Sequence, residues 1–308
     1  MTNLILVVVI LFVTFIIFFL STWINGFIVL LRYITWVRDR KISLSDFIIL
    51  NLALSRIILH GIPMMVFAVT IFYPHFHHLD IFLYIVDIFW MFTNNLNISL
   101  TSCLNVFYCL KIASFSHKAF LWLKRKISHV VVWILLGSLL YSCFSTLALV
   151  LKFHVYSDMS QMIRSRNDTE EIRRIKTHYY LLHFLGTLWS FIPFSLSLLS
   201  SVLLILSLVR HTKQMKHHST GTKDLSTMAH VRATKVILFS FILFIGYLLT
   251  FFLAMYSFFF PHFLLVMILS LIFTVFSSVQ TFTLILENQK LKQEFLWMFQ
   301  VIKRRPKC

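Results

Sequence analysis

Residues 4–31 read LILVVVILFVTFIIFFLSTWINGFIVLL, an apolar run without a single charged side chain. A helix needs about 20 consecutive apolar residues to cross the hydrocarbon layer of a membrane. The run is too long for the hydrophobic region of a signal peptide, and no small-residue cleavage site follows a basic start. We therefore expect a retained membrane-spanning helix at this end of the chain.

Six further apolar stretches of similar length follow the first one. The whole chain is 59% hydrophobic and only 13% charged, which is too few polar residues to cover a soluble protein of 308 residues. No segment between the stretches is long enough to fold separately. We predict an all-α membrane protein, in which residues 1–308 form a single seven-transmembrane helix bundle. The expected spans are residues 4–31, 47–72, 81–110, 127–151, 180–209, 236–260 and 262–286.

Basic residues mark one side of the predicted bundle. Lys and Arg gather after the first, third and fifth spans and in the C-terminal tail, whereas residues before the first span and after the second and sixth spans have none. Cytoplasmic loops are enriched in Lys and Arg, so we predict the N-terminus outside and the C-terminus in the cytoplasm. The net charge of +17 comes from these clusters, which we expect to interact with acidic membrane lipid. No nucleic acid partner is therefore expected.

A glycosylation sequence supports this orientation. Asn167-Asp168-Thr169 fits the acceptor pattern for N-linked glycans and lies in the loop between the fourth and fifth spans, on the predicted outer side. We therefore expect a glycan on Asn167.

The sequence offers little to an enzyme or a metal site. Ionisable groups inside the spans are sparse and do not converge, and no metalloprotease or serine hydrolase motif is present. We predict no catalytic residues, no cofactor and no metal, since His75, His77 and His78 have only Asp80 nearby to complete a site. A polytopic transporter stays open as the alternative of another class.

Arg56 is the most informative charged residue, because it lies well inside the second span, in Leu52-Ala53-Leu54-Ser55-Arg56. A charged side chain in a membrane is costly and is usually functional. Its guanidinium needs acceptors, and we expect Asn25 of the first span to supply one. A static clamp between helices and an activation switch both remain open for Arg56.

Short motifs are spread over almost the whole chain. They are NGFIV at residues 25–29, LALSR at 52–56, FYCLKIASFS at 107–116, LWLK at 121–124, PFSL at 193–196, SLVRHT at 207–212, DLST at 224–227, AHVRA at 229–233 and NQKLKQ at 288–293. In these motifs the chain resembles the type 2 family of bitter taste receptors, which are G-protein-coupled receptors. The block at the end of the third span, residues 107–116, is the most specific match.

The seventh span departs from that family. The family usually has Pro and then His-Ser in its middle, where this chain has Ser277, Gln280 and Thr281. A missing Pro removes a kink, and Gln in place of His removes a titratable group. We expect the switching of this helix to differ from the family's.

The resemblance implies a plasma-membrane receptor for bitter small molecules that signals through gustducin or another inhibitory-class G protein to phospholipase C and calcium. Residues at the inner ends of the spans are expected to form the coupling surface, with plain anchoring to acidic lipid as the alternative. Together with Asn25 and Arg56 they are Tyr108, Lys111, His211, Lys213, His230 and Lys235. Receptor oligomers and a lipid anchor on Cys308 are left open.

A ligand must enter the bundle from outside, because few residues precede the first span. Asp87, Trp90 and Asn94 share one face of the third span, in its outer half. Trp90 offers an aromatic platform, Asn94 a donor and an acceptor, and Asp87 a partner for a cationic amine. The resemblance adds weight to Trp90 and Asn94.

Other spans should complete this pocket. Tyr247 and Phe251 lie one turn apart in the sixth span, and the resemblance links Tyr247 to activation. His183 and Ser270 are weaker candidates, for which packing is the alternative role. The many Phe residues indicate an apolar or amphipathic ligand. A vomeronasal type 1 pheromone receptor is the alternative of the same architecture.

Overall fold

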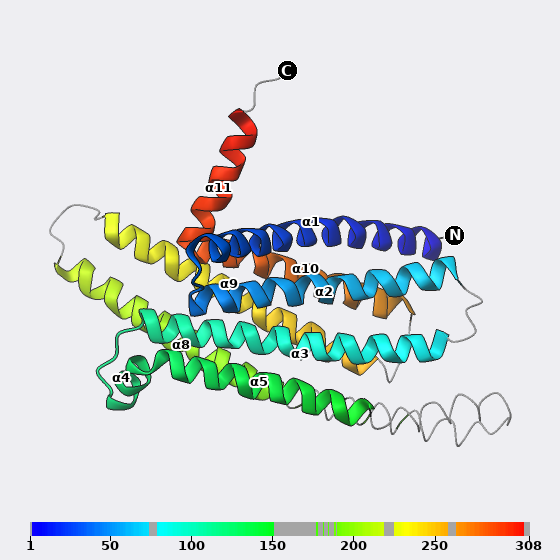
Figure 1. Ribbon diagram of the computed structural model, residues 1–308, viewed down its shortest axis with the longest axis horizontal. Helices are drawn as coiled ribbons and strands as arrows, with labels where there is room; N and C mark the ends of the chain where they lie inside the picture. Colours follow the sequence, from blue (N-terminus) through cyan, green and yellow to red (C-terminus); the bar gives the residue numbers. More distant parts are fainter. Residues whose placement is uncertain are drawn as a thin grey trace.

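The structure is a computed structural model that describes residues 2–73, 79–150, 190–218, 225–257 and 263–304, together with 177, 181, 184 and 188. Every regular element in these ranges is a helix (Figure 1). The longer helices are α1 (Thr2–Asp39), α2 (Leu44–Phe72), α3 (Leu79–Ile112), α5 (Ile127–Val150), α8 (Phe191–His218), α9 (Leu225–Ser257) and α10 (Phe263–Glu287), and the shorter ones are α4 (Lys118–Arg125) and α11 (Gln289–Arg304).

Six of the described helices are long and apolar enough to cross a membrane: α1, α2, α5, α8, α9 and α10. The 34 residues of α3 would span about 51 Å, which is ample length, but α3 is not among the six by apolarity. The polar residues of α3 lower its mean hydropathy. Among them, Asn94, Asn95, Asn97, Ser99 and Ser102 are buried in the protein.

Some helices extend beyond the apolar stretches from which they were predicted. α1 continues to Asp39 and α9 begins at Leu225, since Lys, Arg and Glu favour helix as much as most apolar residues do. The predicted start of the fifth span at Tyr180 lies outside the described residues, and α8 is described from Phe191 onward.

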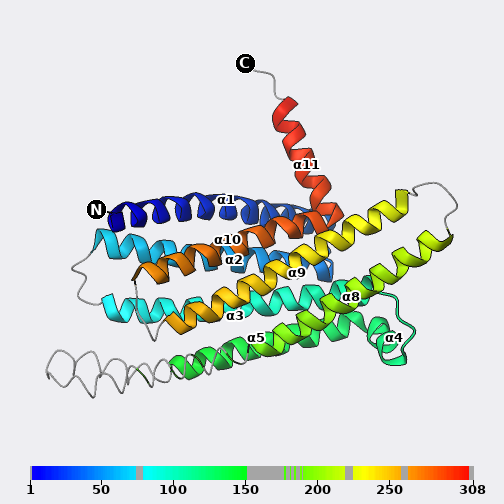
Figure 2. The same ribbon diagram turned by 180° about the vertical axis from the view of Figure 1, so that it is seen from behind.

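α3 lies at the centre of the bundle and packs against α2, α5 and α8. α1 packs on α2, α8 on α9, α9 on α10 and α10 on α1, so that α3 completes a ring of helices between α2 and α8, and α5 joins the bundle through α3. Figures 1 and 2 show the long helices running side by side, while α11 turns away from the bundle at the end where α4 lies.

A buried arginine fastens three helices at that end. Arg32 of α1 donates from Nη1 to Asp46 Oδ1 of α2 at 2.7 Å and from Nη2 to Glu294 of α11. The Arg32 side chain is fully buried. Phe295, next to Glu294, stacks edge-on against Phe27 with ring centroids 5.5 Å apart. The start of α11 is thus fixed to α1 by an ion pair and by aromatic packing.

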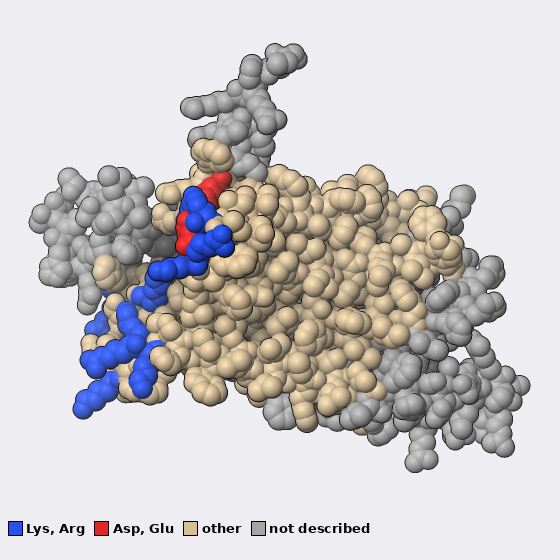
Figure 3. Space-filling model, viewed as in Figure 1, with Lys and Arg blue, Asp and Glu red and all other residues tan. Residues whose placement is uncertain are grey.

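The described basic residues gather at this same end of the molecule. Figure 3 shows Lys and Arg clustered there, whereas the long side of the bundle seen in this view is formed by other residue types. The long sides expose many apolar side chains, among them Phe12, Trp133, Leu140 and Phe144. An apolar belt with charge at one end is the surface expected of a membrane-embedded bundle.

Replacing Arg32 by Met should leave two carboxylates without their shared cation. Both are partly exposed, so we expect a loss of about 2–3 kcal/mol, below the range for fully buried pairs. Thermal unfolding of the purified protein measures it. Arg38→Met is the matched control, because Arg38 is exposed and pairs only with its neighbour Asp39. Equal unfolding temperatures for the two variants would contradict the role given to Arg32.

Candidate functional site

Arg56 lies on α2 in the middle of the bundle and is 2% exposed. Its Nε donates to Asn97 Oδ1 of α3 at 3.3 Å, its Nη1 to Thr281 Oγ1 of α10 at 3.0 Å, and its Nη2 to Gln280 Oε1 at 3.2 Å. These bonds join α2, α3 and α10 around one charge. All three acceptors are neutral.

The expected direct bond between Arg56 and Asn25 is not formed. Asn25 is fully buried on α1. The Thr281 hydroxyl donates to Asn25 Oδ1 at 3.4 Å, so Thr281 connects Asn25 to the guanidinium. Asn25 Nδ2 donates to the Ser21 carbonyl instead. Thr281 and Gln280, two consecutive residues of α10, accept from Arg56 in the place expected for Asn25.

A chain of hydrogen bonds leads from Arg56 to the sixth predicted span. Asn97 Nδ2 donates to Tyr247 Oη at 3.1 Å, and Tyr247 donates to Asn94 Oδ1 at 2.5 Å. A guanidinium only donates, so Asn97 must turn its oxygen toward Arg56 and its NH₂ toward the tyrosine. The direction of every bond in this chain is therefore set by the arginine.

Aromatic rings cover Tyr247 on the side away from Arg56. The ring centroids of Trp90 and Phe251 are 6.0 Å apart, those of Trp90 and Phe273 are 5.7 Å apart, and those of Tyr247 and Phe273 are 4.6 Å apart. We call Trp90, Asn94, Tyr247, Phe251 and Phe273 the aromatic cluster. Four of its members are sequence-predicted ligand residues, while Phe273 is not.

Two of the other predicted ligand residues, Asp87 and Ser270, are half-buried on α3 and α10. The Ser270 carbonyl accepts a bond from Thr274 at 2.8 Å. His183 lies outside the described residues, as does the predicted glycosylation site Asn167.

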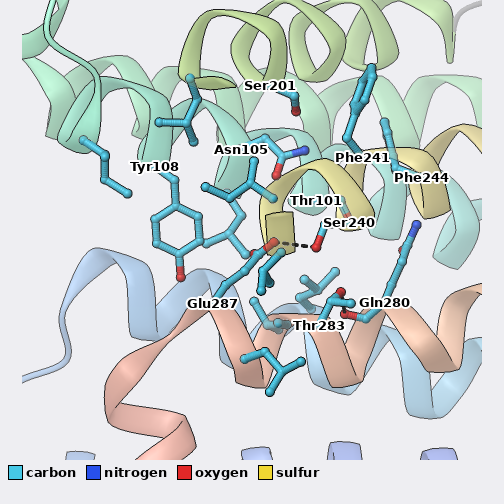
Figure 4. Close-up of a pocket in the computed structure, with 18 of the residues that line it drawn as sticks. Thr101, Asn105, Tyr108, Ser201, Ser240, Phe241, Phe244, Gln280, Thr283 and Glu287 are labelled. Atoms are coloured by element: carbon cyan, nitrogen blue, oxygen red, sulfur yellow. Dashed lines mark hydrogen bonds between the residues drawn. The ribbon is translucent and has the colours of Figure 1, made fainter. Parts of the chain in front are cut away.

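Arg56 also lines a cavity of about 540 Å³, and Figure 4 shows other residues of the cavity lining. We call it the bundle cavity. It follows α3 from Thr101 to Ile112 and so extends toward the end where the basic residues gather. None of the sequence-predicted ligand residues lines it. Its polar lining comprises Arg56, Thr101, Asn105, Tyr108, Ser201, Ser240, Gln280, Thr283, Glu287, Gln289 and Lys292.

A carboxylate lies in the wall of this cavity. Ser240 of α9 donates to Glu287 Oε1 at 2.5 Å, the dashed line in Figure 4, so the bond ties the sixth and seventh predicted spans together. Sequence reasoning missed Glu287 because it follows immediately after the predicted end of the seventh span. An acid at the edge of an apolar run was the available signal.

The remaining predicted coupling residues lie on α3, α8 and α9. Tyr108 lines the bundle cavity, and Lys111 is exposed with its Nζ 5.5 Å from the centroid of Phe107. His211 and Lys213 are exposed near the end of α8, and Lys235 is exposed on α9, ten residues after its start. His230 belongs to α9, but its side chain is outside the described part, and so are His75, His77, His78 and Cys308.

Comparison with known proteins identifies the family. The profile of the family described as "Taste receptor protein (TAS2R)" matches residues 1–303. The chain is 46% identical to "Taste receptor type 2 member 3" of Papio hamadryas over 90% of this chain and 88% of the relative. It is 45% identical to the protein of that name in Homo sapiens, over 92% and 90%. The chain belongs to the type 2 taste receptor family, as its sequence resemblance predicted.

Proposed function

We propose that the chain is a G-protein-coupled receptor for bitter small molecules, with seven spans, its N-terminus outside and its C-terminus in the cytoplasm. Family membership supports the receptor role. We assign the seventh span to α3, because it has the length to cross the membrane and packs against α2, α5 and α8, three of the six apolar helices. The basic end of the bundle then faces the cytoplasm (Figure 3), in agreement with the positive-inside rule.

In this orientation the agonist binds at the outer side of the aromatic cluster. Trp90 and Phe251 offer ring faces, and Asn94 Nδ2 is buried without a hydrogen-bond partner. An unpaired buried amide donor is costly, so a ligand with an acceptor oxygen gains by pairing with it. Asp87, His183 and Ser270 complete the proposed site toward the outer surface. The expected agonist is an apolar or amphipathic molecule.

The observation that carries the proposal is a chain of contacts from the aromatic cluster to the bundle cavity. It runs from Asn94 through Tyr247 and Asn97 to Arg56, whose partner Gln280 lines the bundle cavity. A ligand that pairs with the free Nδ2 of Asn94 also acts on the orientation of this side chain, whose Oδ1 accepts from Tyr247 in the chain. It can then shift an equilibrium between helix arrangements, provided that it binds one of them more tightly.

The G protein engages the cytoplasmic end in this account. The proposed coupling surface comprises Tyr108, which lines the cavity, with Lys111 of α3, His211 and Lys213 of α8, and His230 and Lys235 of α9. Outward movement of the α8 and α9 ends would widen the bundle cavity for a segment of the G protein. We propose a gustducin-type partner, signalling to phospholipase C and calcium from the plasma membrane, with acidic inner-leaflet lipid as a second contact.

The rival pheromone-receptor function receives no support from the comparisons, which match a taste receptor profile and taste receptors by name. Transport is likewise disfavoured, since the chain lies within one receptor family over nearly its full length.

Trp90→Ala and Asn94→Ala should each weaken the calcium response to an activating bitter compound by about tenfold or more in EC50. The reason is loss of the Trp90 ring platform or of the free amide donor of Asn94. Cells expressing the receptor with a gustducin-type G protein provide the measurement, with surface expression quantified. Phe89→Ala is the matched control, because Phe89 is 61% exposed on the same helix. Unchanged EC50 in both test variants would place the ligand elsewhere.

The orientation has its own test. Asn167→Gln should remove one N-linked glycan and increase the electrophoretic mobility of the receptor to that of glycosidase-treated wild type. Thr169→Ala should do the same, because it destroys the acceptor pattern without changing the asparagine. A wild-type protein whose mobility does not respond to glycosidase, although it reaches the cell surface, would contradict an outer location for this loop.

A further inference from the structure

The charge of Arg56 is not matched by a carboxylate in direct contact. Its three hydrogen-bond partners are amides and a hydroxyl. Within the described helices, the ion pairs involve Arg32 and Arg38 but neither Arg56 nor Glu287. A buried cation with neutral partners is unfavourable until an anion approaches it. The molecule therefore has an electrostatic reason to attract an anion to this point.

Hydrogen-bond donors beside Arg56 remain unused. The three bonds occupy three of the five guanidinium N–H groups. Gln280 accepts from Arg56 through Oε1, so its NH₂ must point elsewhere, and that Nε2 is buried without a hydrogen-bond partner. Gln280 is 6% exposed. Two adjacent side chains thus offer N–H groups that no acceptor of the described residues uses.

Both side chains line the bundle cavity, which at about 540 Å³ has room for a ligand. The charged residues among its described lining are Arg56, Glu287 and Lys292. The Glu287 carboxylate is bonded to Ser240, as Figure 4 shows. Gln280 and Glu287 are seven residues apart on α10, or about 10 Å along the helix. The carboxylate therefore disfavours multiply charged anions without occupying the place beside Arg56.

We propose that the bundle cavity binds a monovalent anion against the guanidinium of Arg56 and the Nε2 of Gln280. The anion can be a halide from solution or the carboxylate of an amphipathic molecule whose apolar part contacts Leu104, Phe241 and Phe244. Bound there, it neutralises the arginine and accepts from the free donors. It stabilises the arrangement of α2, α3 and α10 that Arg56 holds together.

The test uses the purified full-length receptor in uncharged detergent. Thermal unfolding is followed in sodium chloride, sodium bromide and sodium isethionate at equal ionic strength, since isethionate is a bulkier anion. A second series compares decanoate with decanol at equal, submicellar concentration. We expect a saturable rise of several degrees in unfolding temperature with the halides or with decanoate. Preference for halide or for decanoate identifies the source of the anion.

Gln280→Glu gives the sharpest comparison, because it replaces the free NH₂ by a carboxylate oxygen of nearly the same shape. The built-in charge should occupy the anion position, abolish the anion dependence and leave the unfolding temperature at or above that of wild type. Arg38→Gln removes an exposed arginine outside the cavity and should keep the wild-type response.

Two results would overturn the proposal. One is a wild-type receptor whose unfolding temperature is the same in halide and isethionate and the same in decanoate and decanol. This outcome does not depend on any variant folding. The other is an anion response that persists at full size in Gln280→Glu. Neither result concerns signalling, so the proposed receptor function stands or falls separately.

Discussion

The constraint on which the rest of the structure depends is a guanidinium that can only donate, buried between helices in a membrane protein. Arg56 is 2% exposed and needs acceptors that water does not supply. It finds them on α3 and α10, so that it fixes the distance between three helices at the level of the bundle centre. The same bonds separate the aromatic cluster on one side from the bundle cavity on the other.

That constraint also gives the polar core a direction. Because Arg56 must face oxygens, Asn97 and Gln280 turn their NH₂ groups away from it, one toward Tyr247 and one without a partner. The tyrosine then donates to Asn94, whose own NH₂ has no partner either. The unsatisfied donors, on Asn94 and Gln280, thus lie at the two ends of a hydrogen-bonded chain that passes through Arg56. One end faces the proposed agonist and the other lines the cavity on the side of the proposed G protein.

Local sequence patterns predicted the positions of the helices and the importance of Arg56. They could not predict which distant residues pair in the folded protein. Apolar runs located the helices, and a charge inside such a run identified Arg56 as important. The sequence did not indicate its partners, because Gln280 and Thr281 lie more than 200 positions away and were noticed only as departures from the family. Arg32 resembled an ordinary loop cation, since nothing local reveals that Asp46 and Glu294 converge on it. The cavity depends on the packing of six helices, and no residue pattern encodes its volume.

The most direct test of the account is a double-mutant cycle between Arg56→Met and Thr281→Val, measured as the free energy of unfolding in mixed micelles. The account predicts a coupling of about 1.5–3 kcal/mol, the range for a hydrogen bond to a charged group. Thr35→Val is the matched control, because the Thr35 hydroxyl bonds only to the Leu31 carbonyl of its own helix and should not couple to Arg56. Additive effects of Arg56→Met and Thr281→Val would contradict the claim that Arg56 holds α2 and α10 together.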